Sequence, residues 1–343
     1  MTTPSRVTIK DVAARAGVSK GAVSLAFNRK PGVSDATRDR IFEAARQLGW
    51  EPNPTARSLA GRRVDAVGLA ICRPARLLGL EPFYMEFVSG VESVLTEHAC
   101  SLLLRLVRTV EEEVGLQDSW WRGKHVSGSI LVDFRADDPR AAAVRRLGIP
   151  VVAVGHPSLT GGLTSVWTDD ASAVTEAVRY LAALGHVRIA RVGGTAALGH
   201  TAIRTAAFDA AARALGLTGA SQVATDFSGD VGARATRSLL AAPAADRPTA
   251  IVYDNDIMAV AGLSVAAEMG LSVPGDVSLL AWDDSQLCRL THPTLSAMSH
   301  DVHGFGAEVA RTLFGVITGD GGAGSHAVPT PVLTPRGSTA PPR

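Results

Sequence analysis

Over the first fifty residues, apolar side chains recur at the spacing expected of short helices. In the first stretch they are Ile9, Val12, Ala13 and Ala16. Positions three and four apart share one face of a helix, so this stretch predicts a helix with one buried face. Thr8, followed three residues later by Asp11, is a capping-box start for it, and Gly17 is a stop.

A second helix is predicted directly after this stop, with Ser19 as its N-cap. Its apolar face carries Ala22, Val23, Ala26 and Phe27, and its opposite face carries Lys20, Gly21, Ser24, Leu25 and Asn28. About four residues including a glycine join the two helices, as in a helix-turn-helix, whose second helix lies in the major groove of DNA. An αα-hairpin packed in a protein core has the same pattern, so the pattern alone leaves both interpretations open.

Two further helices are predicted before residue 64. Ser34 caps the first of them, whose apolar face runs up to Gly49. Asn53 as N-cap and Pro54 at the first helical position begin the other, and Gly61 ends it. At about seven residues this last helix is too short to be stable alone in water.

From Val64 onwards, short apolar runs alternate with amphipathic helical stretches. The runs include VDAVGLAIC, SLLLRLV, SGSILVDF, PVVAVG, VRIARVGG, AIVYD and VSLLAW, with helical stretches such as ASAVTEAVRYLAALG between them. This alternation predicts parallel sheets covered by helices on both faces. Because there are more strands than one sheet comfortably holds, we expect two lobes.

Composition places the chain among globular proteins, with 46% hydrophobic and 20% charged residues. It has no apolar run long enough to span a membrane, and its N-terminus lacks an apolar signal core, so we expect a cytoplasmic protein with no membrane partner. Metal-ligand spacings, a nucleophile elbow and a phosphate loop are all absent from the sequence. We therefore expect no enzyme activity, no metal and no cofactor.

Charge divides the chain into two parts. Residues 1–63 hold twelve Lys/Arg and five Asp/Glu, a net charge of +7, whereas the whole chain is +1 and the remainder is therefore −6. A basic head on an acidic body is the electrostatic footprint of a protein that binds phosphate groups. The charge distribution thus favours a DNA-binding helix-turn-helix over a core hairpin.

The segments VTIKDVAARAGVSKGAVSLAFN, VSDATRDRIFEAARQLGWEPN and ARSLAGRR resemble the DNA-binding head of the LacI/GalR family of bacterial transcription regulators. The match is dense over residues 7–63 and continues more loosely to the C-terminus. The resemblance implies an N-terminal all-α helix-turn-helix head followed by a two-lobed α/β effector domain. The lobes are expected to be built like those of periplasmic binding proteins, with parallel sheets and three crossovers between them.

The same resemblance predicts the domain boundaries. It places the head at 1–52, a hinge helix at 53–63, and the effector-binding and dimerisation domain at 64–343. We expect the first lobe at about 64–162 and 292–322, and the second lobe at about 163–291 and 323–338. The crossovers are then expected near 160–168, 288–295 and 320–328.

Within the head, the resemblance assigns contacts with DNA. Ser19 and Ser24 are expected to hold phosphates, while Lys20 and Leu25 match base-reading positions of the family. Gly21 has no side chain to reach a base, and Leu25 can donate no hydrogen bond. We therefore expect the helix to recognise few bases in the major groove. Leu59 matches the leucine that the family wedges into a minor-groove base step, and Ala56 the residue packed beside it. The other expected contacts are Thr8, Asn28, Thr37, Asn53 and Arg57.

The effector site is expected at the carboxyl ends of the strands, where open α/β lobes bind ligands. By resemblance, Arg204 in HTAIRTAAF matches an arginine that grips the ligand, Asn255 belongs to the ND pair of the family, and Asp283 matches its ligand-binding aspartate. The whole expected site comprises Phe83, Tyr84, Asp133, His200, Arg204, Tyr253, Asn255, Trp282 and Asp283. Carboxylate, amide and guanidinium groups beside aromatic rings suit a sugar or a nucleoside-like ligand.

These features predict a ligand-responsive repressor that binds a near-palindromic double-stranded DNA operator as a homodimer. A small polyhydroxylated effector is expected to release it from DNA. A co-repressor-dependent or activating regulator of the same family fits the same residues. A stand-alone sugar-binding protein would share the two lobes but would have no use for the basic residues 7–63.

Overall fold

The computed structural model describes residues 7–27, 30–50, 66–74, 78–321 and 324–343. The chain forms two compact units, Met1–Val64 and Asp65–Arg343. The first unit, the head, contains the predicted helices as α1 (Ile9–Ala16), α2 (Lys20–Phe27) and α3 (Asp35–Leu48). The predicted hinge helix falls within 51–65, outside the described residues.

A small apolar core holds the three helices of the head together. Val12, Val23 and Ile41, one from each helix, are fully buried. The ring of Phe27 lies edge-on to that of Trp50, with 5.2 Å between the ring centroids. The helical periodicity of the sequence therefore identified the buried faces correctly.

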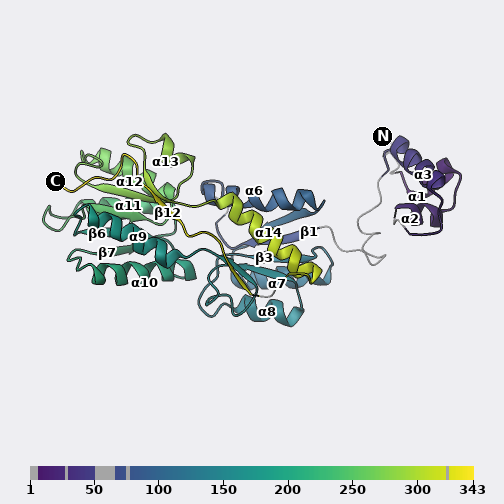
Figure 1. Ribbon diagram of the computed structural model, residues 1–343, viewed down its shortest axis with the longest axis horizontal. Coiled ribbons are helices and arrows are strands. Elements are labelled where there is room, and N and C mark those ends of the chain that lie inside the picture. The colour runs from purple at the N-terminus through teal and green to yellow at the C-terminus, as the bar shows by residue number, and fades with distance from the viewer. Residues whose placement is uncertain (1–6, 28–29, 51–65, 75–77, 322–323) are drawn as a thin grey trace. The chain divides into compact units, whose positions relative to one another are not determined.

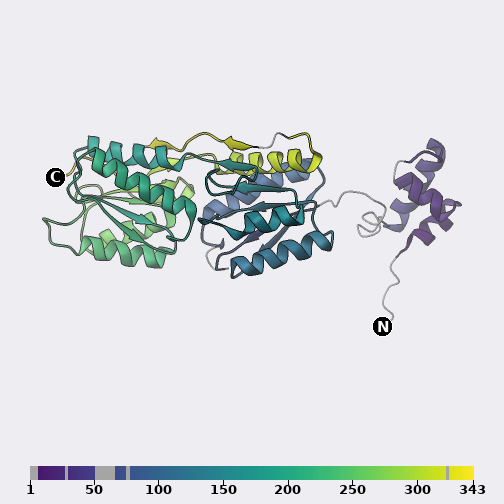
Figure 2. The same cartoon turned by 90° about the horizontal axis from the view of Figure 1, so that it is seen from below.

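The second unit, the effector unit, contains two six-stranded sheets with helices on both faces (Figures 1 and 2). The first sheet has the order β11 (Ser325–Ala327), β5 (Ser165–Trp167), β4 (Val151–Val154), β3 (Gly128–Leu131), β1 (Ala66–Ile71) and β2 (Ser101–Leu106). The second has the order β12 (Val332–Thr334), β10 (Ser296–Ser299), β9 (Ser278–Asp283), β8 (Ala250–Tyr253), β6 (Ile189–Gly193) and β7 (Ser221–Ala224). All neighbouring strands are parallel except β12, which runs antiparallel to β10.

The helices divide between the two lobes. The first lobe contains α6 (Pro82–Glu97), α7 (Val110–Arg122), α8 (Pro139–Leu147) and α14 (Val302–Thr318). The second contains α9 (Asp170–Ala183), α10 (Gly199–Ala214), α11 (Gly229–Leu240), α12 (Asp256–Glu268) and α13 (Gln286–Leu290). Helices α6 and α14 lie side by side, and Gly90 and Gly306 permit this approach because a Cβ atom at either position would overlap backbone of the other helix. Among the described residues, no helix is long and apolar enough to cross a membrane.

Strand pairing moves the lobe boundaries that were expected from the sequence. The first lobe extends beyond 162, because β5 pairs with β4. The second lobe extends beyond 291, because β10 pairs with β9. From the sequence, we expect the second lobe to resume at 323. In the structure β11 still pairs with β5 of the first sheet, so the third crossover follows β11. Boundaries of this kind are set by hydrogen bonds between distant strands, which the local apolar pattern does not encode.

Candidate DNA-binding face and effector cleft

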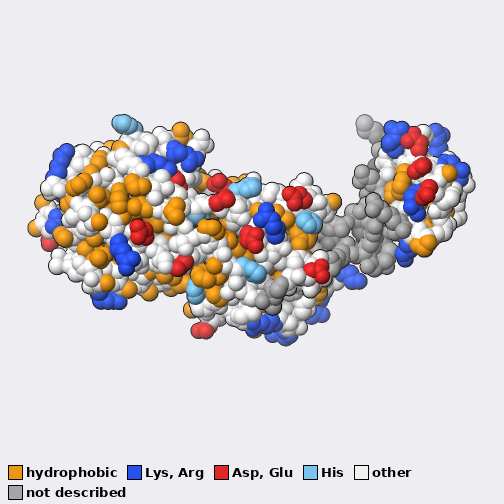
Figure 3. Space-filling view, in the orientation of Figure 1, with side chains coloured by type: hydrophobic (Ala, Val, Ile, Leu, Met, Phe, Trp, Pro, Cys, Tyr) orange, Lys and Arg blue, Asp and Glu red, His pale blue; other side chains and the backbone are white. Residues whose placement is uncertain are grey.

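The start of α2 presents a polar face to solvent. Lys20, Gly21 and Ser24 are exposed, whereas Leu25 is half-buried with its side chain beside Gly32. Figure 3 shows Lys and Arg side chains over the surface of this unit. A helix that carries one long basic side chain among small residues can approach the edges of DNA bases closely.

Several predicted DNA-contact residues also cap the helices of the head. The Asp11 carboxylate accepts hydrogen bonds from the Thr8 amide and hydroxyl, at 2.8 and 2.7 Å. The Ser19 hydroxyl accepts one from the first turn of α2 at 3.1 Å, and the hydroxyls of Ser34 and Thr37 lie 2.9 Å apart. These bonds hold the helix starts, so contacts with phosphate would be additional to them. The predicted contacts Asn28, Asn53, Ala56, Arg57 and Leu59 lie outside the described residues.

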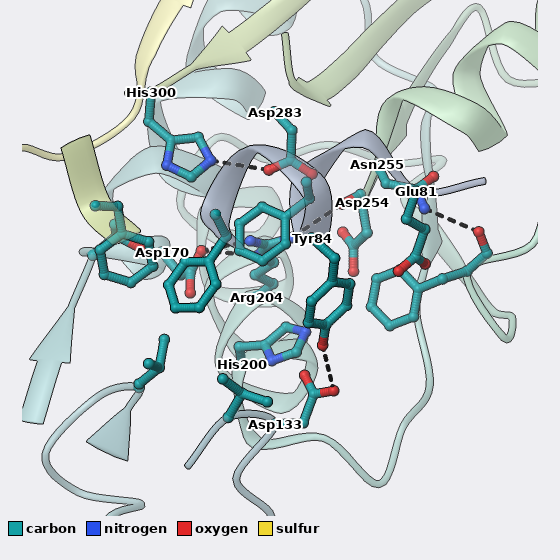
Figure 4. Close-up of a pocket in the computed structure, with 18 of the residues that line it drawn as sticks. Glu81, Tyr84, Asp133, Asp170, His200, Arg204, Asp254, Asn255, Asp283 and His300 are labelled. Carbon is teal, nitrogen blue, oxygen red and sulfur yellow. Dashed lines mark hydrogen bonds and ion pairs between the residues drawn. The ribbon is translucent and has the colours of Figure 1, made fainter. Parts of the chain in front are cut away.

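A cavity in the effector unit lies at the carboxyl ends of the strands of both sheets (Figure 4). From the first lobe its wall carries Arg73 after β1 and Asp133 after β3. From the second lobe it carries Asn255 after β8 and Asp283 at the end of β9. This position is the one at which open α/β sheets bind their ligands.

The first-lobe wall is organised by the Arg73 guanidinium. It donates to both carboxylate oxygens of Asp133, at 2.7 and 3.0 Å, and lies 3.3 Å from the carboxylate of Glu81. The Tyr84 hydroxyl donates to Asp133 at 2.7 Å. Burial alone would raise the pKa of Asp133, but the charge and hydrogen bonds of Arg73 hold that pKa well below its usual range. Asp133 is therefore an anion at neutral pH.

Glu81 has a different electrostatic environment from Asp133. Burial raises the pKa of Glu81 to about 7; Arg73 opposes this shift, and the carboxylates of Asp133, Asp283 and Asp256 add to it. The side chain therefore changes its charge near neutral pH.

The second-lobe wall is organised by Arg204, on α10. Its Nε and Nη2 atoms lie 2.9 and 2.8 Å from Oδ1 of Asp170, and its Nη1 atom donates to the backbone carbonyl of Asp254 at 3.2 Å. The guanidinium carbon lies 4.1 Å from the centre of the Trp282 ring. The ion pair and the cation–π contact together hold Arg204 in one position.

Two imidazoles extend the polar lining. Burial, and after it the charge of Arg204, lowers the pKa of His200, so this ring is neutral at pH 7 and can both donate and accept a hydrogen bond. The Nε2 atom of His300 lies 3.0 Å from Asp283, and its ring stacks on that of Phe83 with 6.2 Å between centroids.

Asn255 lines the cavity, and its side chain forms two hydrogen bonds with neighbouring backbone. Its Oδ1 atom accepts from the Met258 amide at 2.9 Å and caps α12, and its Nδ2 atom donates to the Phe227 carbonyl at 2.9 Å. The Phe227 ring, from the second lobe, lies 4.7 Å from the guanidinium carbon of Arg73 in the first lobe. Asn255 therefore positions a ring that contacts the opposite lobe.

Seven of the nine expected effector residues line the cavity: Phe83, Tyr84, Asp133, His200, Arg204, Asn255 and Asp283. The other two expectations are wrong. Tyr253 is fully buried with its hydroxyl 3.0 Å from that of Thr236, and Trp282 lies 1% exposed in the core beneath Arg204. Both belong to strands, where side chains stand perpendicular to the sheet and pack under helices rather than pointing past the strand end.

Sequence reasoning missed several residues of the cavity wall. They are Arg73, Glu81, Asp170, Phe227 and His300. Arg73 and His300 closely follow apolar strands, so the rule that ligands meet strand ends could have found them. Glu81 and Phe227 lie in connections whose course depends on tertiary packing, and no sequence signal marked them.

Comparison with known proteins agrees with this architecture. Residues 8–53 match the family described as bacterial regulatory proteins, lacI family, and residues 178–339 match the periplasmic binding protein-like domain. The HTH-type transcriptional regulator CelR of Thermobifida fusca is 33% identical over 320 residues, which cover 92% of this chain and 93% of that protein.

Two solved structures share this fold and match nearly the whole length of the chain. A transcriptional regulator CelR–cellobiose complex is 31% identical, covers 97% of this chain and 100% of that chain, and has a TM-score of 0.71. The lac repressor dimer bound to operator and the anti-inducer ONPF is 25% identical, covers 97% and 99% of the two chains, and has a TM-score of 0.84. The chain therefore belongs to the LacI family of bacterial regulatory proteins, and it is a ligand-responsive, DNA-binding transcription regulator rather than an enzyme.

Proposed function

We propose that the protein is a repressor that binds a near-palindromic operator as a homodimer and leaves it when a small polyhydroxylated ligand enters the effector cleft. The observation that carries this proposal is the presence, in one chain, of an exposed helix-turn-helix face and a polar cavity between two lobes. The relatives support it, because one is a complex with cellobiose and another is a dimer bound to operator.

On DNA, each head of the dimer would take one half-site. Lys20 would donate to a guanine edge, Leu25 would touch a thymine methyl, and Ser19 and Ser24 would contact phosphates. Because this set of side chains reads few bases, the two Leu59 side chains at the centre of the site and the deformability of the DNA would supply the rest of the specificity.

In the effector unit, the ligand would act by shifting a population of lobe arrangements. Contacts between the lobes, such as Arg73 with Phe227 and the Gly199 amide donating to the Phe134 carbonyl at 2.7 Å, define the arrangement described here. A ligand that binds one arrangement better favours it by its differential affinity, which must reach about 5.5 kcal/mol to reverse a ratio of 1:99 to 99:1. The hydroxyl-binding groups Arg204, Asp283 and His200 would provide that differential affinity.

The test is to select operators from random duplexes with purified full-length protein, and then to repeat the capture with sugars and nucleosides added. An enriched palindrome that one compound depletes supports a ligand-released dimer. Enrichment only in the presence of a compound would instead identify a co-repressor-dependent regulator. No enrichment at low salt with any compound would contradict sequence-specific binding.

The hinge assignment has its own test in Leu59→Ala. Loss of the wedge should weaken operator binding much more than binding to random DNA, because only the specific complex bends the duplex around an inserted side chain. Titration of both duplexes at one salt concentration measures the two losses. Equal losses for the two duplexes would remove Leu59 from the base step.

A further inference from the structure

The turn that follows β9 has an unusual backbone. Asp283 and Asp284 are adjacent, and both have left-handed φ angles, 76° and 54°. Residues other than glycine rarely adopt this region, although Asp does so more readily than most, and they keep it where the surrounding structure fixes them. Asp283 lines the effector cavity, whereas Asp284 is bonded to side chains outside the cavity wall. The turn therefore directs two neighbouring carboxylates to different parts of the molecule.

Two side chains hold the carboxylate of Asp284. Arg336 donates to it through both terminal nitrogens, at 2.6 and 2.7 Å, and the Ser299 hydroxyl donates to its Oδ2 atom at 2.6 Å. The side chains of Asp284 and Arg336 are 11% and 17% exposed. Burial would raise the pKa of Asp284, but the hydrogen bonds from Arg336 and Ser299 lower it below its usual value. Asp284 is therefore an anion in a bidentate, charge-assisted bond, which is among the stronger polar contacts in proteins.

Both partners of Asp284 lie where the chain crosses between the lobes. Ser299 is the last residue of β10, and the chain then enters α14 of the first lobe. Arg336 follows β12, which the chain reaches after leaving β11 of the first sheet. The Ser299 hydroxyl also lies 2.7 Å from that of Thr334, in β12. Asp284 thus joins the ends of two crossovers to one turn of the second lobe.

The neighbouring Asp283 connects the same turn to the effector cavity and to the first lobe. It lies beside Ser299 in the register of β9 and β10, and its Oδ1 atom lies 3.0 Å from Nε2 of His300 (Figure 4). The ring of His300, on the second crossover, stacks on Phe83 of α6. A ligand that displaces Asp283 therefore acts on a turn that Asp284 fastens to two of the connections between the lobes.

We propose that Asp284 is a positioning residue of the effector site, which ties the turn that carries Asp283 to the second and third crossovers. This inference rests on the proposed role of the cleft as the effector site. Asp283 contacts the ligand, and the bonds of Asp284 to Arg336 and Ser299 make that contact act on the arrangement of the lobes. Asp284 thereby determines how strongly a bound ligand changes the affinity for the operator, which is a coupling free energy between two sites.

A role confined to the stability of the turn predicts a different result. Loss of the ion pair would then weaken ligand binding, but a saturating ligand would still lower operator affinity as much as it does in the parent protein. A role in coupling predicts that the effect on the operator stays small even when the cleft is fully occupied. Saturation with ligand therefore distinguishes the two roles.

The variants separate the side chain from the backbone. Asp284→Gly removes the carboxylate and keeps the turn, because glycine adopts positive φ without strain. Arg336→Gln removes the charge and the bidentate bond from the other side, and the double variant should be no worse than either single one, since each breaks the same contact. Asp284→Asn keeps one acceptor for Arg336 and tolerates the same φ, so it should have an intermediate effect. Asp246→Gly, exposed in the turn between α11 and β8, is the matched control.

The first measurement is hydrogen exchange of the full-length proteins, followed by mass spectrometry, without ligand or DNA. Peptides that contain Ser299 and Thr334 should exchange at least about tenfold faster in Asp284→Gly and Arg336→Gln than in the parent and the control. Melting curves identify a variant that fails to fold, and Asp284→Asn then takes its place. Parent-like exchange of either peptide in the folded variants would overturn the inference.

The second measurement is affinity for the selected operator with and without saturating cellobiose, the ligand in the complex of a relative. Cellobiose should lower the operator affinity of the parent and the control, and its effect on Asp284→Gly should be at least about tenfold smaller. A full effect on Asp284→Gly at saturation would overturn the role in coupling. If cellobiose binds the parent protein without changing its operator affinity, the ligand-released mechanism is wrong. If cellobiose does not bind, hydrogen exchange alone decides whether Asp284 ties the crossovers.

Discussion

The head and the effector cleft differ in how far their functional side chains are exposed and in how firmly other side chains hold them. In the head, Lys20 and Gly21 are exposed on a helix whose other face packs on a small core. In the cleft, Arg204 is buried and Arg73 is half-buried, and each is bonded to a carboxylate and lies over an aromatic ring. The first arrangement suits a partner that brings its own dense charge, and the second suits a small ligand that needs pre-positioned groups.

This difference means that stability and function should be coupled differently in the two units. A side chain on the reading face contributes to DNA affinity and little to folding. A charged side chain in the cleft contributes to both, because its removal leaves a buried partner without its counter-charge. Substitutions in each unit test this contrast.

The largest effect is expected for Arg204→Ala. The change leaves the half-buried carboxylate of Asp170 without its cation, which costs up to about 3–5 kcal/mol, and it should also abolish the response to ligand. Denaturant unfolding of the effector unit and ligand titration measure the two effects. Arg213→Ala, exposed on the last turn of the same helix, is the control. A variant that unfolds and responds like the parent protein would remove Arg204 from the site.

Next is Ile41→Ala, in the core of the head. Ile41 is fully buried, and such truncations cost about 2–5 kcal/mol, which a head with so small a core cannot absorb. We expect operator binding to be lost while ligand binding in the effector unit is retained. Asp39→Asn, exposed on the same helix, should change neither. Loss of ligand binding in the Ile41 variant would show that the two units do not fold independently.

A smaller effect is expected for Glu81→Gln, which should change how the free energy of unfolding depends on pH. With its pKa raised to about 7 by burial, Glu81 binds its proton more tightly in the folded than in the unfolded state. Its contribution to stability is therefore fully present below the unfolded pKa and is lost as pH rises through 7. The parent protein should lose about 2 kcal/mol more than the variant between pH 5 and pH 7. Glu97→Gln, at the exposed end of α6, should follow the parent curve, whereas parallel curves for Glu81→Gln and parent would contradict the shift.

The smallest change in stability is expected for Lys20→Ala, which should affect only the binding of DNA. If Lys20 donates to a base, operator affinity should fall by about 1–3 kcal/mol and discrimination at one position should relax. Binding to a panel of operator variants measures both. Lys124→Ala, in the effector unit, is the control. A uniform loss over all sequences, with a shallower salt dependence, would instead make Lys20 a phosphate contact.

Local sequence was sufficient to predict the head. The apolar spacing in 9–27 and the capping residues around it depend on neighbours within a few positions, and α1, α2 and α3 begin and end where these signals lie. The strand–helix alternation likewise predicted two α/β lobes, because burial on both faces of a parallel sheet leaves continuous apolar runs. The resemblance to a known family then identified most of the cavity wall.

Only the tertiary structure decided where the chain crosses from one lobe to the other and which polar groups come together in the cleft. The sheet membership of β5, β10 and β11 depends on pairing between segments far apart in sequence. Arg73 meets Asp133 across sixty positions, and Trp282 turns out to support Arg204 rather than to face the cavity. Hydrogen bonds and ion pairs between distant residues set these arrangements, and their strength depends on burial, which periodicity along the chain does not specify.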